Sequence, residues 1–427
     1  MRMVDSAISR ADNREAVAVF DDYGAPILAC LQSLGKRGVP IHVYGRGRGA
    51  AGRWSRFRTS YRRCPPVDDT DAFLPWLRGK LRSGEIGRVL PTTDLLAYYV
   101  SCLREEFSET VRRAIPPLGE IEDCLIKSRF AERCAKVGVK VPATSTARDL
   151  GEALRLAEEI GFPMIVKPNS HLGIGMAERG AVIESEKELR ASFKPYSFHR
   201  LHRLFARAYP DLAGPLIQSY LPAGDRRVYS VSGVKDPANG IVAAALTYKA
   251  EQWPPRVGIS TQQISCQDQR ILQAGVAAVD ALISCGIFEL EMIEQDGELH
   301  VIELNPRGFG FMALDIELGN DLPWLWYQST FGPVAKAAAP ARETPLQCRS
   351  ALQFHVSRWV GLLKGPGRYR KLVAYAGELS SQTVLMSGRW RDPLPMLIAL
   401  LSNLRHPRSL IAPYLRRPSG GALVENV

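Results

Sequence analysis

The residues best suited to chemistry lie between Glu291 and Arg307. Two runs, 288–293 and 299–304, alternate polar and apolar residues and are separated by a segment containing Asp-Gly. This pattern predicts two antiparallel strands joined by a tight hairpin turn. Glu303, Asn305 and Arg307 are two residues apart, so their side chains leave the same face of the second strand. Glu291 can lie across from them on that face.

This face offers oxygen ligands and a fixed positive charge. Mg²⁺ prefers oxygen ligands and usually takes one or two carboxylates together with substrate phosphates. Glu291, Glu303 and the amide oxygen of Asn305 suit such an ion, and Arg307 adds a cation beside it. The alternative is a solvated strand face with ordinary charge pairs, which does not account for the Asn-Pro-Arg ending.

A second motif lies upstream, where a lysine ends a strand and glycines follow. Residues 159–161 read as a helix end stopped by glycine, and 162–168 predict a buried strand that carries Lys167. The next segment contains Gly173 and Gly175, which allow backbone amides to approach phosphate oxygens closely. Residues 180–183 predict a returning strand. The Lys-Ser/Thr ending of a Walker loop is absent, so on its own this motif favours a plain hairpin.

Three segments together resemble the ATP-grasp superfamily: residues 162–168 with their glycine segment, residues 217–225, and residues 291–307. They follow the family's order and spacing across roughly residues 120–320. The chain is similar to carboxylate-amine ligases and to the ATP-grasp domains of carbamoyl phosphate synthase, biotin carboxylase and D-Ala-D-Ala ligase. The resemblance implies two α+β lobes that clamp ATP between them.

The resemblance also implies roles for single residues. Lys127 and Lys167 would hold the nucleotide phosphates, and Asp225 would bind the ribose. Residues 218–221 would form the hinge strand whose backbone reads adenine. The whole set of residues implied to contact ATP is Lys127, Lys167, Ser170, Gly173, Gly175, Gln218, Ser219, Tyr220, Leu221 and Asp225. Glu291, Glu303 and Asn305 would bind the metal, and Arg307 would steady the reacting oxyanion.

Two residues depart from the family pattern. Gln218 stands where an acid is common, which affects the expected adenine contact. Glu289 stands where some carboxylate-amine ligases have an arginine that binds substrate. The chemistry of the acceptor site therefore cannot be copied from those ligases.

The function implied by the resemblance is ATP-dependent ligation of a small carboxylic acid to an amine, amino acids included. The acid would be activated as an acyl phosphate, with ATP and one or two Mg²⁺ ions as cofactors, for which Mn²⁺ can substitute. The product would be an amide or peptide. The alternatives are a bicarbonate-dependent carboxylase or carbamoylating enzyme, and a non-catalytic ATP-binding regulatory protein.

A loop between the hinge and the hairpin offers two further candidates for catalysis. Residues 243–249 predict a strand that ends in Lys249, and a Trp-Pro-Pro-Arg loop that carries Arg256 follows. Such a rigid loop could form a lid over phosphates or a substrate carboxylate. An ordinary surface loop fits the pattern equally well.

The chain of 427 residues is long enough for several domains. We predict α/β plus α+β architecture, with a Rossmann-like pre-ATP-grasp domain at 1–120, ATP-grasp lobes at 121–215 and 216–332, and a basic C-terminal region at 333–427. The first domain opens with a βαβ pattern that lacks the Gly-x-Gly-x-x-Gly fingerprint, which argues against a nicotinamide site. Asp94 follows a strand in this domain, either at a ligand position or as a helix N-cap.

Charge is concentrated in two places. The formal net charge is +11, and the residues from Gly332 onward carry fourteen Lys/Arg against four Asp/Glu. Within them, the apolar run 393–401 is far shorter than the about 20 residues that span a bilayer. Arginines follow it, so this tail predicts peripheral contact with an anionic membrane, or docking on the protein's own core or a partner. Seven arginines and no acid between Arg46 and Arg63 form either a solvated face or a surface that steers an anionic substrate.

The composition of the chain indicates a cellular compartment and bears on the expected binding partners. The eight cysteines show no Cys-x-x-Cys pair, which is typical of thiols in a reducing cytoplasm. The first thirteen residues lack the apolar stretch of a signal peptide. We therefore expect a cytoplasmic protein, with the inner face of the membrane as the site of any peripheral contact. No base-stacking motif accompanies the charge, so nucleic acid is not an expected partner. No coiled-coil repeat indicates an oligomeric state.

Overall fold

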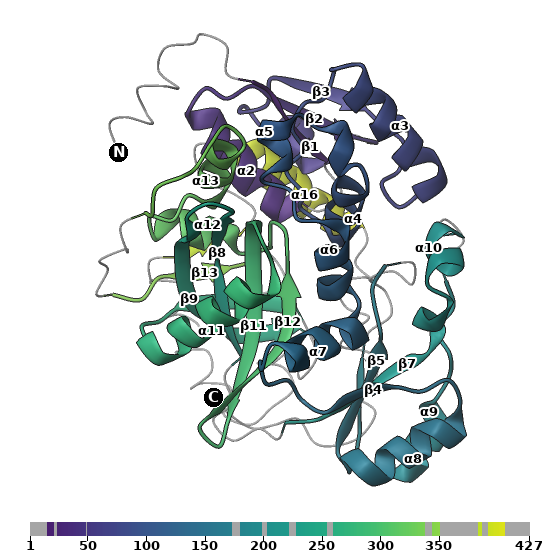
Figure 1. Cartoon of the computed structure of the whole chain (residues 1–427). Helices are drawn as coiled ribbons and strands as arrows, with labels where there is room; N and C mark the ends of the chain where they lie inside the picture. The colour runs from purple at the N-terminus through teal and green to yellow at the C-terminus, as the bar shows by residue number, and fades with distance from the viewer. Residues whose placement is uncertain are drawn as a thin grey trace.

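The computed structural model of the protein describes residues 15–20, 24–47, 49–172, 180–198, 203–221, 228–253, 259–337, 344–350, 383–386 and 392–405. Within these ranges the strands form a three-stranded, a four-stranded and a seven-stranded sheet. Figure 1 shows the four-stranded sheet with α8 and α9 as a lobe at the lower right, apart from the large central sheet.

The N-terminal sheet is parallel, as the βαβ pattern predicts. It contains β1 (Val17–Phe20), β2 (Ile41–Gly45) and β3 (Ser60–Arg63), and Ala18 forms an isolated parallel bridge with Val89. Helix α2 (Gly24–Lys36) connects β1 to β2. The helices that follow are η1 (Ala51–Trp54), α3 (Thr70–Arg82), α4 (Asp94–Cys102), η2 (Arg104–Glu106), α5 (Glu109–Arg112), α6 (Leu118–Leu125) and α7 (Lys127–Lys136).

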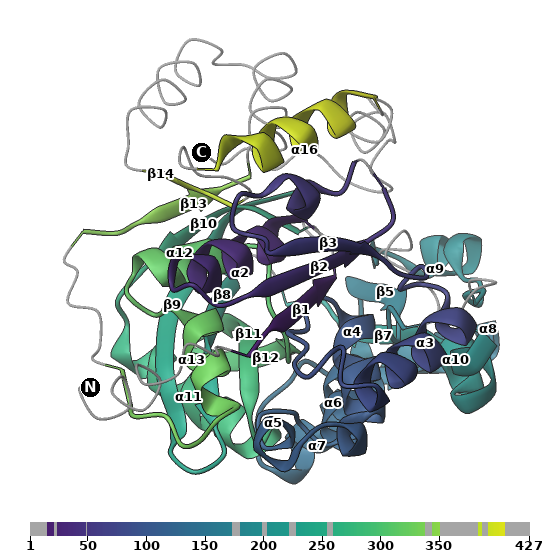
Figure 2. The same cartoon turned by 90° about the horizontal axis from the view of Figure 1, so that it is seen from above.

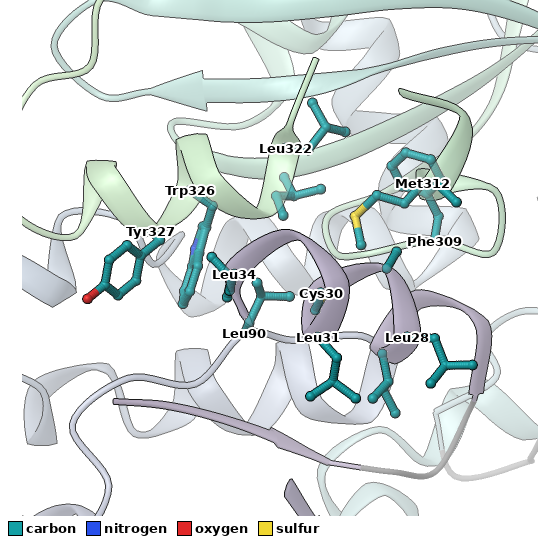
Figure 3. Close-up of a cluster of buried hydrophobic side chains, with 14 of the residues drawn as sticks. Leu28, Cys30, Leu31, Leu34, Leu90, Phe309, Met312, Leu322, Trp326 and Tyr327 are labelled. Carbon is teal, nitrogen blue, oxygen red and sulfur yellow. The ribbon is translucent and has the colours of Figure 1, made fainter. Parts of the chain in front are cut away.

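Helix α2 joins the N-terminal sheet to the central one through a shared apolar core. Its buried residues Leu28, Leu31 and Leu34 belong to the same cluster as Met312 and Trp326, and Figure 3 shows these side chains gathered around the helix. Met312 and Trp326 come from α12 (Met312–Glu317) and α13 (Leu322–Ser329). Because burial of each large apolar side chain contributes about 1.5–3 kcal/mol, this core holds the N-terminal elements firmly against the rest.

The four-stranded sheet has the order β4-β7-β5-β6, with all neighbours antiparallel. Its strands are β4 (Thr144–Thr146), β5 (Met164–Pro168), β6 (Ala181–Ile183) and β7 (Pro215–Ser219). The associated helices are α8 (Leu150–Ile160), α9 (Glu186–Ser192), α10 (Arg203–Ala208) and η3 (Pro210–Ala213). The predicted glycine stop is present, because α8 ends at Gly161 with a φ of 80°. Strand β7 runs past residue 215, where we predicted the boundary between lobes.

The seven-stranded sheet has the order β12-β11-β8-β9-β10-β13-β14. Its strands are β8 (Val228–Asp236), β9 (Gly240–Trp253), β10 (Ile259–Ser265), β11 (Gly286–Gln295), β12 (Glu298–Asn305), β13 (Gln347–Arg349) and β14 (Thr383–Leu385), and α11 (Gln269–Leu282) packs on one face. Strands β13 and β14 come from the region we set apart as a basic tail. That region therefore completes the edge of the central sheet.

The predicted hairpin is confirmed. Strands β11 and β12 pair antiparallel, with Glu291 opposite Glu303. Asp296 and Gly297 both have positive φ, at 52° and 78°, which the tight hairpin turn requires and which asparagine, aspartate and glycine tolerate best. A register shift follows Glu291, so the regular pairing of the candidate ligands ends there.

The C-terminal apolar run forms helix α16 (Pro393–Arg405), which Figure 2 shows lying near β3. The sequence also favours a strand at 352–356, which lies outside the described residues, as do the arginines that follow the apolar run beyond residue 405. All eight cysteines are free thiols. Within the described ranges, the helices are too short or too polar to cross a bilayer.

Candidate functional site

The hairpin face carries the candidate metal ligands as a cross-strand set. Glu291 lies opposite Glu303, and Asn305 lies opposite Glu289. The Glu303 side chain is 36% exposed, against 18% for Glu291. The Glu303 carboxylate is therefore more accessible to a ligand than the Glu291 carboxylate.

Two lysines face these carboxylates from different elements. Lys249 Nζ of β9 lies 2.9 Å from Glu291 Oε1, and Lys127 Nζ, at the start of α7, lies 4.0 Å from Glu303 Oε1. Although burial opposes it, Glu291 holds the pKa of Lys249 above its ordinary value. Burial likewise opposes ionisation of Glu303, but Lys127 and His171 hold its pKa below the usual range. Lys249 and Glu303 are therefore charged at neutral pH.

Lys167 is placed on β5, next to the hinge. Its Nζ donates to Gln218 Oε1 at 2.9 Å, and Gln218 Nε2 donates to Thr144 Oγ1 at the same distance. Burial and the neighbouring Lys127 lower the pKa of Lys167 to about 8. Two neighbouring ammonium groups in a partly buried position are suited to bind an anion. The glutamine at position 218 orients one of them.

The base of the glycine segment is tied to the start of α7. The Lys127 amide donates to Asn169 O at 2.8 Å, and the Ser128 amide donates to Asn169 Oδ1 at 2.9 Å. Ser170 is fully buried, and its hydroxyl donates to Leu125 O at 2.7 Å. This hydroxyl is bonded to the protein's own backbone, so the geometry gives Ser170 a part in shaping the loop.

Several predicted residues fall outside the described ranges or at their edge. Gly173, Gly175, Asp225 and Arg256 are not among the described residues. Gln218 and Ser219 end β7, an inner strand of the lobe's sheet, and Tyr220 and Leu221 follow them. The Tyr220 amide donates to Pro163 O at 3.3 Å. The adenine-reading role of this segment stays a prediction.

Arg307 is held by three hydrogen bonds. Its Nε donates to Asp94 Oδ1 at 2.6 Å, one terminal nitrogen donates to Asn305 Oδ1 at 2.9 Å, and the other donates to Gly308 O at 3.1 Å. Two of the five guanidinium N–H groups are not used in these bonds. The guanidinium is thus fixed in orientation while it retains donors for a bound oxyanion.

Asp94 belongs to this site, although it lies 213 positions before Arg307. The N-cap of α4 is Thr93, whose side chain accepts from the Leu96 amide, so the helix-cap interpretation of Asp94 is wrong. Burial works against its ionisation, but the Arg307 guanidinium lowers the pKa of Asp94 below its ordinary value. The only signal for Asp94 in the sequence was its place after a strand.

The residues present fit a divalent cation bound together with phosphate. Two carboxylates and an amide oxygen are hard oxygen donors, and the second lone pair of Asn305 Oδ1 is not used by Arg307. In the part of the chain that the structure describes, no three His, Cys, Asp or Glu side chains form a cage by themselves. A magnesium ion that takes its remaining ligands from nucleotide phosphates and water matches this incomplete set.

Part of the chain matches a known protein family. Residues 127–199 match the family described as the carbamoyl-phosphate synthase L chain, ATP binding domain. The carbamoyl phosphate synthase large chain of Pyrococcus furiosus is 30% identical over 199 residues, which cover 45% of this chain and 17% of that protein. The chain thus matches less than a fifth of the length of this relative.

Solved structures extend the similarity beyond the matched segment. N5-carboxyaminoimidazole synthetase from Staphylococcus aureus superimposes with a TM-score of 0.60 at 16% identity, over 81% of this chain and 84% of the other. The biotin carboxylase domain of Hydrogenobacter thermophilus 2-oxoglutarate carboxylase, solved with MgADP, ADP and bicarbonate, gives 0.58 at 16% identity, over 76% and 71%. L-amino acid ligase from Bacillus licheniformis gives 0.54 at 15% identity, over 76% of both chains.

The family match, the relatives and the shared fold support assignment of the chain to the ATP-grasp superfamily, in agreement with the resemblance seen in its motifs. The relatives and neighbours named above are synthases, carboxylases and ligases.

Proposed function

We propose that this protein is an ATP-dependent ligase that joins a carboxylic acid to an amine through an acyl phosphate. The observation that carries the proposal is the convergence of Lys127 and Lys167 on Glu303, with Arg307 fixed beside it. Phosphoryl transfer requires mainly positioning and charge compensation, and these side chains supply both. The neighbours include an L-amino acid ligase, whose name describes this class of reaction.

In the proposed reaction the chain's residues have separate tasks. Lys127 and Lys167 hold phosphate oxygens, and Lys167 faces the hinge through Gln218. Magnesium held by Glu291, Glu303 and Asn305 would offset charge on the phosphates. Arg307 binds the oxyanion that forms when the amine attacks the activated carbonyl, because preorganised donors at such a position lower the barrier. Asp94 and Asn305 keep its guanidinium in place.

The direct test is release of ADP and phosphate from Mg-ATP with pooled carboxylic acids and amines, followed by mass spectrometry. We expect release that needs one acid and one amine, with a product lighter than their sum by one water. Release that needs bicarbonate in place of the organic acid would support the carboxylating alternative, in line with the bicarbonate-bound neighbour. ATP binding without release in any pool would support a regulatory protein.

ATP binding is expected to take up protons at alkaline pH. The pKa of Lys167 is about 8 without nucleotide, and an adjacent phosphate favours the charged form and raises it. Above pH 8, free Lys167 is largely neutral, so binding must add a proton, and affinity falls as pH rises further. Calorimetry in buffers of different ionisation enthalpy measures this uptake. Lys167→Arg stays charged throughout, so uptake that persists in this variant would contradict the assignment.

We further propose that the surface formed by α16 and η1 contacts an anionic lipid bilayer. Leu394, Leu397 and Leu401 have helical spacing that places them on one face of α16, and they are 53%, 46% and 52% exposed. Helix α16 packs beside η1, and Ser55 Oγ donates to Asp392 Oδ2 at 2.5 Å. Arg53 of η1 and Arg56, whose amide donates to Asp392 Oδ1 at 3.1 Å, therefore lie close to α16. Apolar side chains flanked by arginines match the surface of an anionic bilayer.

Sedimentation with vesicles tests this surface. We expect binding to vesicles that contain phosphatidylglycerol, weaker binding to phosphatidylcholine alone, and weakening by salt. Replacing Leu394 and Leu397 together by Asp should lower the bound fraction about tenfold, a loss of about 1.4 kcal/mol. Ile259→Asp, at a residue with 37% exposure on β10, is the control. Unchanged binding of the double variant would overturn the proposal and leave docking within the protein or on a partner.

A further inference from the structure

A second acidic group lies on the same sheet face as the candidate metal ligands. Glu289 lies opposite Ser232 of β8 and opposite Asn305 of β12. The Ser232 hydroxyl donates to Asp315 Oδ1 at 2.7 Å, which brings a carboxyl group of α12 to this face. Glu289 is 3% exposed, and Asp315 is fully buried. Neither carboxyl group is needed for the proposed metal.

Each of these two carboxyl groups has one satisfied oxygen and one open oxygen. Glu289 Oε2 accepts from Asn305 Nδ2 at 2.7 Å, whereas Glu289 Oε1 and Asp315 Oδ2 have no hydrogen-bond partner among the described residues. The nearest lysine of the site, Lys249, makes its ion pair with Glu291. A buried polar atom without a partner costs roughly 1–3 kcal/mol. Two open oxygens on one face therefore indicate a donor that belongs to a ligand.

We infer that this face binds a primary ammonium group carried by the amine substrate. An ammonium has three N–H donors and a positive charge, so it satisfies open carboxyl oxygens, whereas a carboxylate is repelled from them. The inference rests on the proposed ligase function and names the class of its second substrate. Asn305 contacts both Glu289 and Arg307, so a cation held at Glu289 lies one side chain away from the proposed oxyanion site.

Placement of the polar residues supports a substrate role over a purely structural one. Glu289, Ser232 and Asp315 lie where the apolar core around α12 meets the acidic hairpin face. In carboxyl groups with a purely structural role, both oxygens would accept hydrogen bonds from the protein. Asp236 is an example, because it accepts from Arg113 and from the Ala238 amide. Glu289 and Asp315 do not meet this condition.

The test measures binding of small probes to the full-length protein with Mg²⁺ and a non-hydrolysable ATP analogue. Saturation-transfer NMR at neutral pH compares butylammonium with butyrate and 1-butanol, which have the same chain length. We expect butylammonium to bind at least about tenfold more tightly than the other two. Glu289→Gln and Asp315→Asn should each weaken butylammonium binding about tenfold, while the analogue still binds.

The matched control is Glu298→Gln, which neutralises an exposed carboxylate at the far end of the same hairpin. A preference for butyrate, or unchanged butylammonium binding in both variants, would overturn the inference. If Glu289→Gln fails to fold, Asp315→Asn decides alone. Because binding is measured without turnover, an ammonium preference in a protein that shows no ADP release with any acid and amine would keep this site and remove the ligase proposal.

Discussion

Replacing Glu303 by Gln is expected to lower Mg-ATP turnover at least about a hundredfold, which corresponds to about 2.7 kcal/mol in the barrier. Glu303 is the most exposed of the candidate ligands, and it faces Lys127 at 4.0 Å. Glutamine keeps the size of the side chain but removes the charge that a divalent cation requires. The loss should appear in turnover and in the Mg²⁺ concentration needed for half-maximal rate.

Glu298→Gln provides the matched comparison for Glu303, because it lies on the same strand and neutralises a carboxylate. Glu298 is exposed and forms an ion pair with Lys140 at the surface, and exposed pairs contribute little to stability. We expect its turnover to equal that of the parent protein. If Glu303→Gln kept turnover within about tenfold of the parent, the assignment of the hairpin face as the metal site would be wrong.

The hairpin could be predicted because its information is local: alternating residues fix which side chains share a face, and Asp296-Gly297 fixes the turn. The pairing of Glu291 with Glu303 does not follow from the turn alone. The register that the turn sets would place Glu291 opposite Ile302, and the shift between Glu291 and Met292 brings it opposite Glu303. The lysine on β5 was predictable for a similar reason, since a buried strand with a lysine near its end leads into the loop.

Contacts between distant segments were not predictable in this way. Asp94 reaches Arg307 from another part of the chain, and Asp315 reaches Ser232 from a helix. Both depend on how α4 and α12 pack, which no local pattern encodes. The C-terminal region illustrates the same limit: its charge suggested a separate tail, but β13 pairs with β10 at three positions. A three-residue strand has too few residues to show an alternating pattern.

The last large effect is expected at Arg307. Arg307→Lys should lower turnover about a hundredfold while ATP binding changes little, because a lysine keeps one charge but loses the planar fork that bonds Asp94, Asn305 and the oxyanion together. This selective loss distinguishes a group that acts on the reacting oxyanion from one that holds ATP. The turnover rate and the dissociation constant for ATP, both measured on the same preparation of the variant, test this expectation.

Asp94→Asn separates orientation from charge in the same network. The amide can still accept from Arg307 Nε, so the guanidinium keeps its place, but the ion pair at 2.6 Å is lost. We expect a decrease of about tenfold in turnover, smaller than for Arg307→Lys, because an interaction that only positions another group contributes less than the group itself. Asp69→Asn, at the N-cap of α3, should leave turnover unchanged.

A decrease at Asp94 as large as that at Arg307 would mean that the carboxylate itself contacts the substrate or the metal. No decrease at either residue would remove Arg307 from the reaction.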